Sequence, residues 1–166
     1  MLFPMAHPDF DTLLNSLAPF AKQMLAEHGE FYPFGATITP DGQVAAHAGY
    51  EGSEHPETEA VIALLTRALR EQAAGGHIRA AGLCKDVRTI APGQTRKTDA
   101  LCFKLEHRTG EAVTVFIPYK KGFFGGYKYA EMFLSPHAPE FFVVSGKSRD
   151  GDGTEKGGRG RDSNAN

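Results

Sequence analysis

The stretch Ala100-Leu101-Cys102-Phe103-Lys104-Leu105-Glu106-His107 decides the fold that this sequence predicts. Large apolar side chains occupy every second position, at Leu101, Phe103 and Leu105. The positions between them are expected to face water, and they hold Cys102, Lys104 and Glu106. An alternation with a period of two is typical of a β-strand with one buried face and one solvated face. We expect Glu106 and His107 to form a solvent-exposed pair at the end of this strand.

Two further β-prone segments lie next to this strand in the sequence. Residues 77–90 end at Ala91-Pro92-Gly93, and residues 112–119 follow the turn Arg108-Thr109-Gly110-Glu111. Both connections are short, and a parallel pair would need a crossover of about a dozen residues or more. Three consecutive antiparallel strands are therefore predicted.

A β-hairpin is predicted upstream of these strands. Residues 34–39 and 44–50 are β-prone and flank Pro40-Asp41-Gly42, which is a strong turn signal. Together with the three strands described above, the hairpin makes a sheet of five antiparallel strands.

Two amphipathic helices accompany the hairpin. Apolar residues at helical spacing predict a helix over residues 9–28, which Gly29 would end. Pro19 would either kink this helix or lie in the first turn of a second helix that begins near Ser16. The other helix follows Ser53 or His55 and continues to about Ala74. Its predicted buried stripe comprises Val61, Leu64, Leu65, Ala68 and Leu69.

The predicted fold class is α+β, with helices packed on one face of the five-stranded sheet in the order α-β-β-α-β-β-β, followed by an unassigned segment. Over residues 9–119 this order resembles that of the roadblock, longin and profilin group of folds. The resemblance implies an architecture and no function, so no site residue is carried over from it. We expect one domain over residues 1–144 and a disordered tail over 145–166, which is rich in glycine and charged residues.

Composition disfavours two classes of partner. The formal net charge is −2 and the isoelectric point is near 6.4, so no overall basic field would attract nucleic acid or an anionic membrane. The stretch Gly157-Gly158-Arg159-Gly160-Arg161 leaves RNA contact as a minor alternative. The start of the sequence lacks the features of a signal peptide, and no apolar run is long enough to span a membrane. We expect a cytoplasmic protein.

Motifs for metal, phosphate or nucleophilic chemistry are incomplete. The triplets His28-Gly29-Glu30 and His55-Pro56-Glu57 match half of a zinc deaminase signature, whose Pro-Cys-x-x-Cys half is absent. Gly146-Lys147-Ser148 lacks the first glycine of a P-loop. Cys84 and Cys102 are expected to be buried free thiols on neighbouring strands, with a disulfide or a reactive thiol as alternatives. No metal or cofactor is predicted.

The segment 118–129 is the main candidate for a contact site, because lysines and aromatic residues surround glycines in it. Such a composition suits a mobile loop that closes over an anionic or planar ligand or docks on another chain. The alternative that we favour is a connection whose aromatic side chains fold back onto the core. Glu30 lies in a second aromatic cluster, and Arg96, Lys97 and Asp99 lie in a polar loop. The candidate contact residues are Glu30, Tyr119, Lys120, Lys121, Phe123, Phe124, Tyr127 and Lys128.

Two functional hypotheses follow from the sequence. The first is a non-enzymatic protein-interaction module, homodimeric, that uses a sheet edge or the 119–129 loop as its contact surface. The second is a small-molecule binding protein or an enzyme, in which Glu30, Lys120, Lys121 and Tyr127 surround a pocket capped by that loop. The missing motifs favour the first hypothesis only slightly, since active sites often assemble from residues far apart in sequence.

Overall fold

The strand that contains Leu101, Phe103 and Leu105 is the centre of the molecule, and all three side chains are fully buried. The computed structural model describes residues 7–48 and 56–143, so the predicted tail lies outside the described residues. The elements in chain order are α1 (Pro8–His28), β1 (Phe34–Ile38), β2 (Val44–Ala48), α2 (Thr58–Ala74), β3 (Ala80–Thr89), β4 (Thr98–His107), β5 (Ala112–Lys121), β6 (Tyr127–Tyr129) and β7 (Phe133–Pro136). The predicted α+β class is confirmed.

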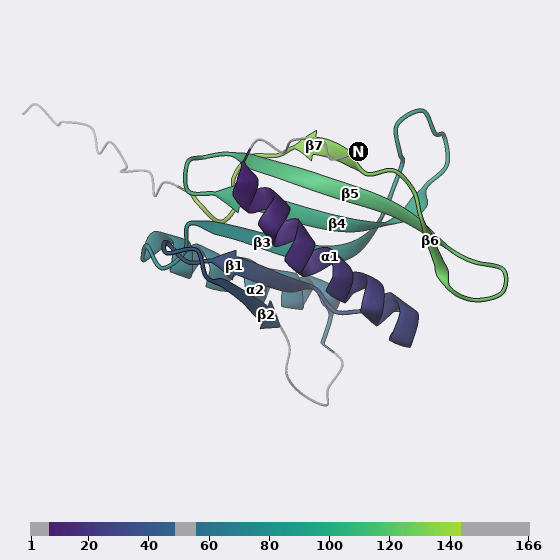
Figure 1. Cartoon of the computed structure of the whole chain (residues 1–166), viewed down its shortest axis with the longest axis horizontal. Coiled ribbons are helices and arrows are strands. Elements are labelled where there is room, and N and C mark those ends of the chain that lie inside the picture. The colour runs from purple at the N-terminus through teal and green to yellow at the C-terminus, as the bar shows by residue number, and fades with distance from the viewer. Residues whose placement is uncertain (1–6, 49–55, 144–166) are drawn as a thin grey trace, which may run out of the picture.

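The strands form one antiparallel sheet in the order β2-β1-β3-β4-β5-β6, and β7 pairs with another stretch of β5 (Figure 1). The antiparallel pairing is as predicted, but the described sheet has seven strands where five were expected. The two missed strands, β6 and β7, are three and four residues long. Segments of this length are too short to show an alternating pattern in the sequence.

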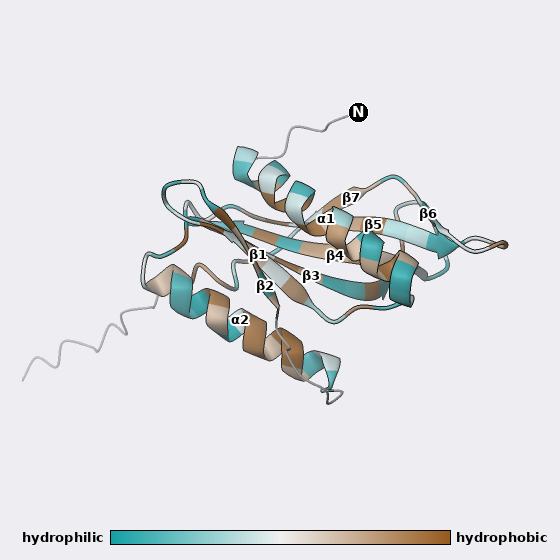
Figure 2. Ribbon diagram, turned by 60° about the horizontal axis from the view of Figure 1, so that its bottom comes forward, coloured by the Kyte–Doolittle hydropathy of each residue, from teal (hydrophilic) through white to brown (hydrophobic). Residues whose placement is uncertain are grey.

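The helices lie on opposite faces of the sheet, which corrects the prediction that both pack on one face (Figure 2). Helix α1 covers the face that carries Leu101, Phe103 and Leu105, whereas α2 covers Ala81 and Leu83. Strand β3 explains this arrangement, because its residues from 80 to 84 are apolar or glycine on both faces. Since successive strand residues point to opposite sides, a strand of this kind must be covered twice.

Helix α1 is one continuous helix that contains Pro19, so the alternative of a second helix starting near Ser16 is wrong. The side chain of His7 caps its first turn by accepting from the Asp9 N–H at 3.0 Å. At the other end Gly29 adopts a left-handed conformation with φ of 73° and donates to the Leu25 carbonyl, as predicted. The helix approaches β3 closely at Gly82, where a Cβ would lie 2.8 Å from Leu17 Cδ1.

Helix α2 buries only part of its predicted stripe. Val61, Leu65 and Leu69 are buried, whereas Ala68 is exposed and Leu64 is 57% exposed. Among the described strands, the helix packs mainly against β3 and β1. Its side nearest to β2 therefore remains open.

The prediction that Lys104, Glu106 and His107 face water is wrong for the last two, since Glu106 is fully buried and His107 is 4% exposed. His107 lies beneath the start of α1, where its Nε2 is 3.0 Å from Asp9. Glu106 lies on the α2 face and is covered by the segment 137–142. Its carboxylate accepts hydrogen bonds from the backbone N–H groups of Glu140, Phe141 and Phe142. This segment also inserts Phe141 into the α2 core and is tied down by a Lys104–Glu140 ion pair of 2.8 Å.

The two cysteines are buried free thiols on neighbouring strands, as expected. Cys84 faces Phe103 across the β3–β4 ladder and Cys102 faces Lys85, so the two thiols point to opposite faces of the sheet. A disulfide between them is therefore excluded by geometry. Burial raises the pKa of both thiols, which keeps them protonated and poorly nucleophilic.

Candidate functional site

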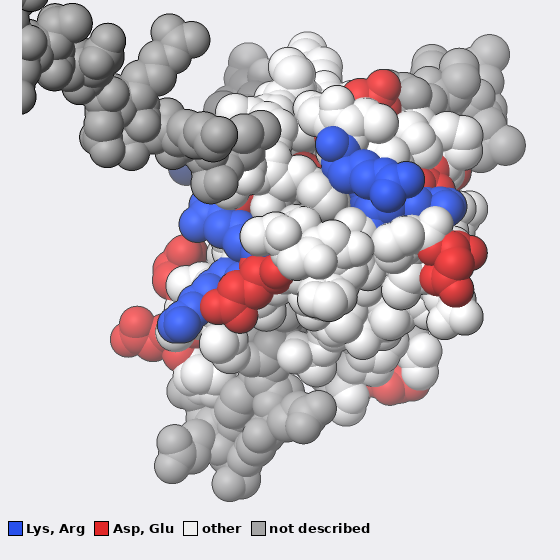
Figure 3. Space-filling view, turned by 90° about the vertical axis from the view of Figure 1, so that its left-hand side faces the viewer, with Lys and Arg blue, Asp and Glu red and all other residues white. Residues whose placement is uncertain are grey.

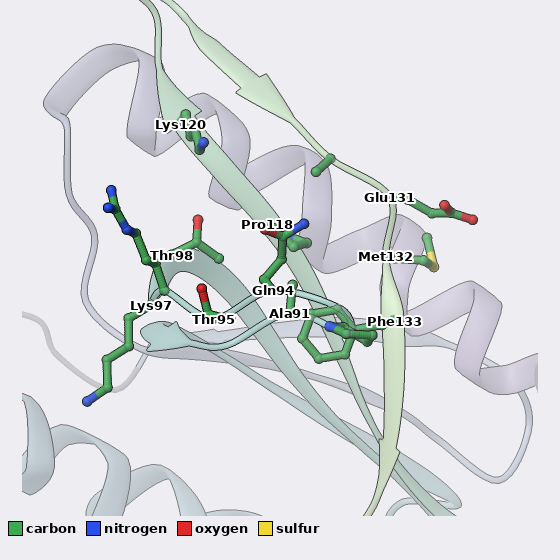
Figure 4. Close-up of a pocket in the computed structure, with 13 residues that line it drawn as sticks. Ala91, Gln94, Thr95, Lys97, Thr98, Pro118, Lys120, Glu131, Met132 and Phe133 are labelled. Atoms are coloured by element: carbon green, nitrogen blue, oxygen red, sulfur yellow. The ribbon is translucent and has the colours of Figure 1, made fainter.

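A cavity of about 900 Å³ opens on the α2 face of the sheet, at the end where the β3–β4 loop meets β5 (Figure 4). Three groups of side chains line it. The basic residues are Arg96, Lys97 and Lys120, the polar ones include Gln94, Thr95 and Thr98, and the apolar ones include Pro118, Met132 and Phe133. The loop 90–97, strand β5 and the connection 130–132 supply most of these groups.

The cavity exists because the two segments that cover the α2 face do not extend over this end of the sheet. Helix α2 lies over β1 and β3, and the segment 137–142 closes the opposite end of β4. The floor is therefore formed by strand residues themselves, with buried Pro118 at its base. Ala130 donates its N–H to the Pro118 carbonyl at 2.8 Å, which attaches the connection after β6 to β5.

One wall of the cavity is apolar and well supported. The ring of Phe133 stacks on that of Phe116 in β5, with a centroid separation of 4.9 Å and an interplanar angle of 18°. The pair is held in register by the β5–β7 ladder, in which these two residues are opposed. Such a wall presents a flat apolar surface to a bound molecule.

The charges around the cavity are predominantly positive. Within the described part of the chain, Arg96, Lys97 and Lys120 form no ion pair or side-chain hydrogen bond. Glu131 is the acidic residue of the lining, and Figure 4 shows its carboxylate directed away from the other labelled side chains. Asp99, which the sequence grouped with this loop, lies opposite Arg88 and its Oδ1 is 3.7 Å from the Arg88 guanidinium. The arrangement can bind an anion.

The structure brings together two sets of residues that the sequence analysis named separately. Lys120 from the lysine-rich segment and Arg96 and Lys97 from the polar loop line the same cavity. Glu30 is exposed just after α1 and is not among the residues that line this cavity. The cavity lies on the α2 face of β5, whereas Tyr119, another of the predicted contact residues, packs in the α1 core.

The aromatic residues at the base of the β5–β6 hairpin belong to the α1 core. Tyr119 is 7% exposed, and its hydroxyl donates to both carboxylate oxygens of Asp86 at 2.8 Å. Burial, followed by this contact with Asp86, raises the pKa of Tyr119, so the phenol stays neutral. Tyr127 and Tyr129 pack against the same core, and Lys22 lies 4.5 Å from the centre of the Tyr129 ring. Tyr119 and Tyr127 therefore both contribute to the packing of the α1 core.

The tip of the same hairpin differs from what the sequence analysis favoured. Phe123 and Phe124 do not fold back onto the core but are 97% and 98% exposed. Their rings contact each other edge to face at 5.3 Å. Gly125 and Gly126 both have positive φ, which explains the glycines in this turn. Lys121 and Lys128 are exposed on the strands behind the tip.

A second, smaller cavity of about 220 Å³ lies between α2 and β2. It is lined mainly by apolar side chains and two polar ones, namely Leu64, Leu65, Ala68, Leu69, Ala48, His47 and Gln72. Among the described strands, β2 pairs only with β1, so its other side is an open sheet edge. The His47 Nε2 is 2.7 Å from the Thr37 hydroxyl oxygen, and burial lowers the pKa of this ring.

A cluster of ionisable residues at the start of α1 was missed by the sequence analysis. The Arg79 guanidinium donates to both oxygens of Asp9, at 2.9 and 3.0 Å, and His107 contacts the same carboxylate. Burial acts to raise the pKa of Asp9, but the hydrogen bonds and charge of Arg79 outweigh it and hold the pKa below its usual value. His7 stacks on His107 with ring centroids 3.7 Å apart.

The cluster has the composition of a metal site, since ligand atoms of His7, Asp9 and His107 lie within 4.8 Å of one another. Arg79 already neutralises the carboxylate, and the Nδ1 atom of His7 accepts from the Asp9 backbone. A cation would have to compete with both contacts. We therefore assign the cluster a structural role, in which it links α1, β3 and β4. No sequence motif could have identified it, because its members come from three distant segments.

Charge at the other end of the molecule, away from the β5–β6 hairpin, is mixed, with basic and acidic side chains interspersed (Figure 3). Within the described residues, no helix has the length and apolar character that crossing a membrane requires. Comparison with protein-family models, with curated proteins and with solved structures gives no match to this chain.

Proposed function

We propose that this chain is a non-enzymatic interaction module that forms a homodimer through the open edge of β2. One observation carries the proposal. The edge sequence Val44-Ala45-Ala46-His47-Ala48 contains no lysine, glutamate or proline, which natural sheets place on exposed edges to prevent pairing with another chain. The lowered pKa of His47 keeps its ring neutral at neutral pH. An edge of this kind is suited to accept a further strand.

The backbone groups that would form the contact can be identified from the hairpin. Thr39 donates its N–H to the Gln43 carbonyl at 2.9 Å, so these opposed residues form a hydrogen-bonded pair. Bonded and non-bonded pairs alternate along an antiparallel ladder, and Ala45 and His47 therefore bond to β1. The residues whose N–H and C=O point to the open side are Val44, Ala46 and Ala48.

A second copy of the chain is the occupant that best fits this edge. Antiparallel pairing about a twofold axis at Ala46 would oppose Val44 to Ala48 of the second copy, and would form about six backbone hydrogen bonds. With this axis perpendicular to the sheet, both α2 helices lie on the same side. The exposed Leu64 and the apolar cavity beside it would then meet their equivalents in the second copy. The dimer thus covers an apolar surface that the monomer leaves open.

The test is the mass of the full chain in solution, measured by size-exclusion chromatography with light scattering from about 1 to 100 µM. We expect twice the chain mass of 18.0 kDa. Ala46→Lys should give a monomer with an unchanged melting temperature, because Ala46 is exposed in the monomer and the twofold axis would place two ammonium groups opposite each other. Ala26→Lys adds the same charge on the exposed surface of α1 and should remain dimeric.

Three results would contradict the proposal. The first is a monomer for the unaltered chain at about 100 µM, and the second is a dimer that survives Ala46→Lys. The third is a dimer that dissociates when Phe123 and Phe124 are both replaced by serine, since the contact would then lie at the tip of the β5–β6 hairpin and not at β2.

A further inference from the structure

We propose that the basic cavity next to Lys120 binds a small organic phosphate that carries a planar ring. Arg96, Lys97 and Lys120 would hold the phosphate, and the wall formed by Phe133 would contact the ring. This inference is independent of the proposed dimer, because the cavity lies at the edge of the sheet opposite to β2.

The first argument is the concentration of unpaired positive charge in a chain that is slightly acidic overall. The formal net charge is −2, yet three cations line one cavity and take no part in an ion pair among residues 7–48 and 56–143. Two other basic side chains are paired instead, Lys104 with Glu140 and Arg79 with Asp9. A doubly charged phosphate would satisfy the cations of the cavity, and the Arg96 guanidinium can donate two parallel hydrogen bonds to it.

The second argument is the supply of hydrogen-bond donors in the loop 90–97. In the described structure the backbone N–H groups of Thr95, Arg96 and Lys97 donate to no protein acceptor. The hydroxyls of Thr95 and Thr98 lie between Lys97 and Lys120 in Figure 4. Phosphate oxygens accept several hydrogen bonds each, and loops with free N–H groups are common anion-binding elements.

The third argument is size and shape. A volume of about 900 Å³ falls within the range of small-molecule pockets, about 300 to 1,000 Å³, and is far larger than an inorganic phosphate needs. The apolar part of the surface has Pro118 at the base and Phe133 fixed in place by its stacking on Phe116. A flat, rigid apolar wall favours a planar group over a flexible chain.

The experiment is isothermal titration of the full chain with four probes: adenosine 5′-monophosphate, phenyl phosphate, adenosine and inorganic phosphate. We expect saturable binding of the first two. Each should bind at least about tenfold more tightly than adenosine or inorganic phosphate, because only the ring phosphates use both the cations and the wall. The two ring phosphates distinguish a nucleotide pocket, where the first binds more tightly, from a general aryl phosphate pocket, and either order supports the proposed class.

Neighbouring lysines provide a matched pair of variants. Lys120→Ala and Arg96→Ala should each weaken binding about tenfold or more. Lys121→Ala removes the same charge from the next residue of β5, but Lys121 is opposed to Tyr127 on the α1 face, so binding should be unchanged. All three side chains are exposed, and the melting temperatures should not change.

The proposal is overturned by the absence of saturable binding of both ring phosphates up to about 10 mM, or by equal affinity for adenosine or inorganic phosphate. An equal loss of affinity in Lys120→Ala and Lys121→Ala would also overturn the proposal, because it would indicate unspecific attraction of the phosphate to surface charge.

Discussion

Replacing Glu106 by glutamine should detach the segment 137–142 from the sheet. The carboxylate is fully buried and accepts the N–H groups of Glu140, Phe141 and Phe142 at 2.8 to 3.3 Å, while His137 Nε2 lies 3.3 Å from it. Both of its oxygens contact the Glu140 N–H, at 2.8 and 2.9 Å. Glutamine preserves the shape of the side chain but directs an NH₂ group toward at least one of these donors.

The magnitude follows from the number of donors. A hydrogen bond to a charged group contributes about 1.5 to 3 kcal/mol, and a buried donor left without a partner costs about 1 to 3 kcal/mol. The glutamine oxygen can still accept from Phe141 and Phe142, so about one charged contact is lost and one donor is left facing an NH₂ group. We expect the free energy of unfolding to fall by about 3 kcal/mol, which for a domain of this size lowers the melting temperature by roughly 10 °C.

The assays are thermal unfolding and hydrogen exchange of the full chain. Amide protection at Phe141 and Phe142 should fall by a larger factor than protection in β4, and chymotrypsin should cleave after these phenylalanines earlier than in the unaltered chain. Glu111→Gln, in an exposed turn, is the control and should leave both readouts unchanged. A Glu106→Gln variant with unaltered melting temperature and unaltered protection at residues 140–142 would refute the reasoning.

Two further outcomes concern α1. Asp9→Asn should reduce stability by about 3 kcal/mol at neutral pH by leaving the Arg79 charge without its partner. The pKa of Asp9 is lower in the folded state than in the unfolded state, where it is near 3.8. The carboxylate therefore contributes its full stabilisation above about pH 3.8, and this stabilisation is lost as the pH falls through the folded-state pKa. Urea unfolding between pH 2 and 7 should therefore show that the free energies of unfolding of Asp9→Asn and the unaltered chain converge below about pH 4. A difference in free energy that stays constant over this range would contradict the ion-pair account. Gly82→Ala should lower the free energy of unfolding by about 1 to 3 kcal/mol in the same measurement, since the added Cβ would lie 2.8 Å from Leu17 Cδ1. An unchanged urea midpoint of unfolding would show that α1 can move away from β3 at no cost.

The candidate site was predicted only in its parts. Lys120, Arg96 and Lys97 were named from local composition, and the cavity that unites them lies between the loop 90–97 and the connection after β6. Composition identifies charged loops because it is local. It cannot indicate that two loops about thirty residues apart in the sequence will meet across a strand.

The sequence by itself determined the elements that depend on neighbouring residues. The spans of α1 and α2, the β1–β2 hairpin at Asp41-Gly42 and the buried alternation of β4 all follow from periodicity, turn chemistry and capping, which act over a few residues. Only the tertiary structure decided which surfaces are covered. Glu106 has the pattern of a solvated strand residue, and its burial depends on three residues, 34 to 36 positions further along the chain, whose N–H groups donate to it. Burial of a strand's second face is a property of what packs on it, and therefore of long-range contacts that the strand's own residues do not specify.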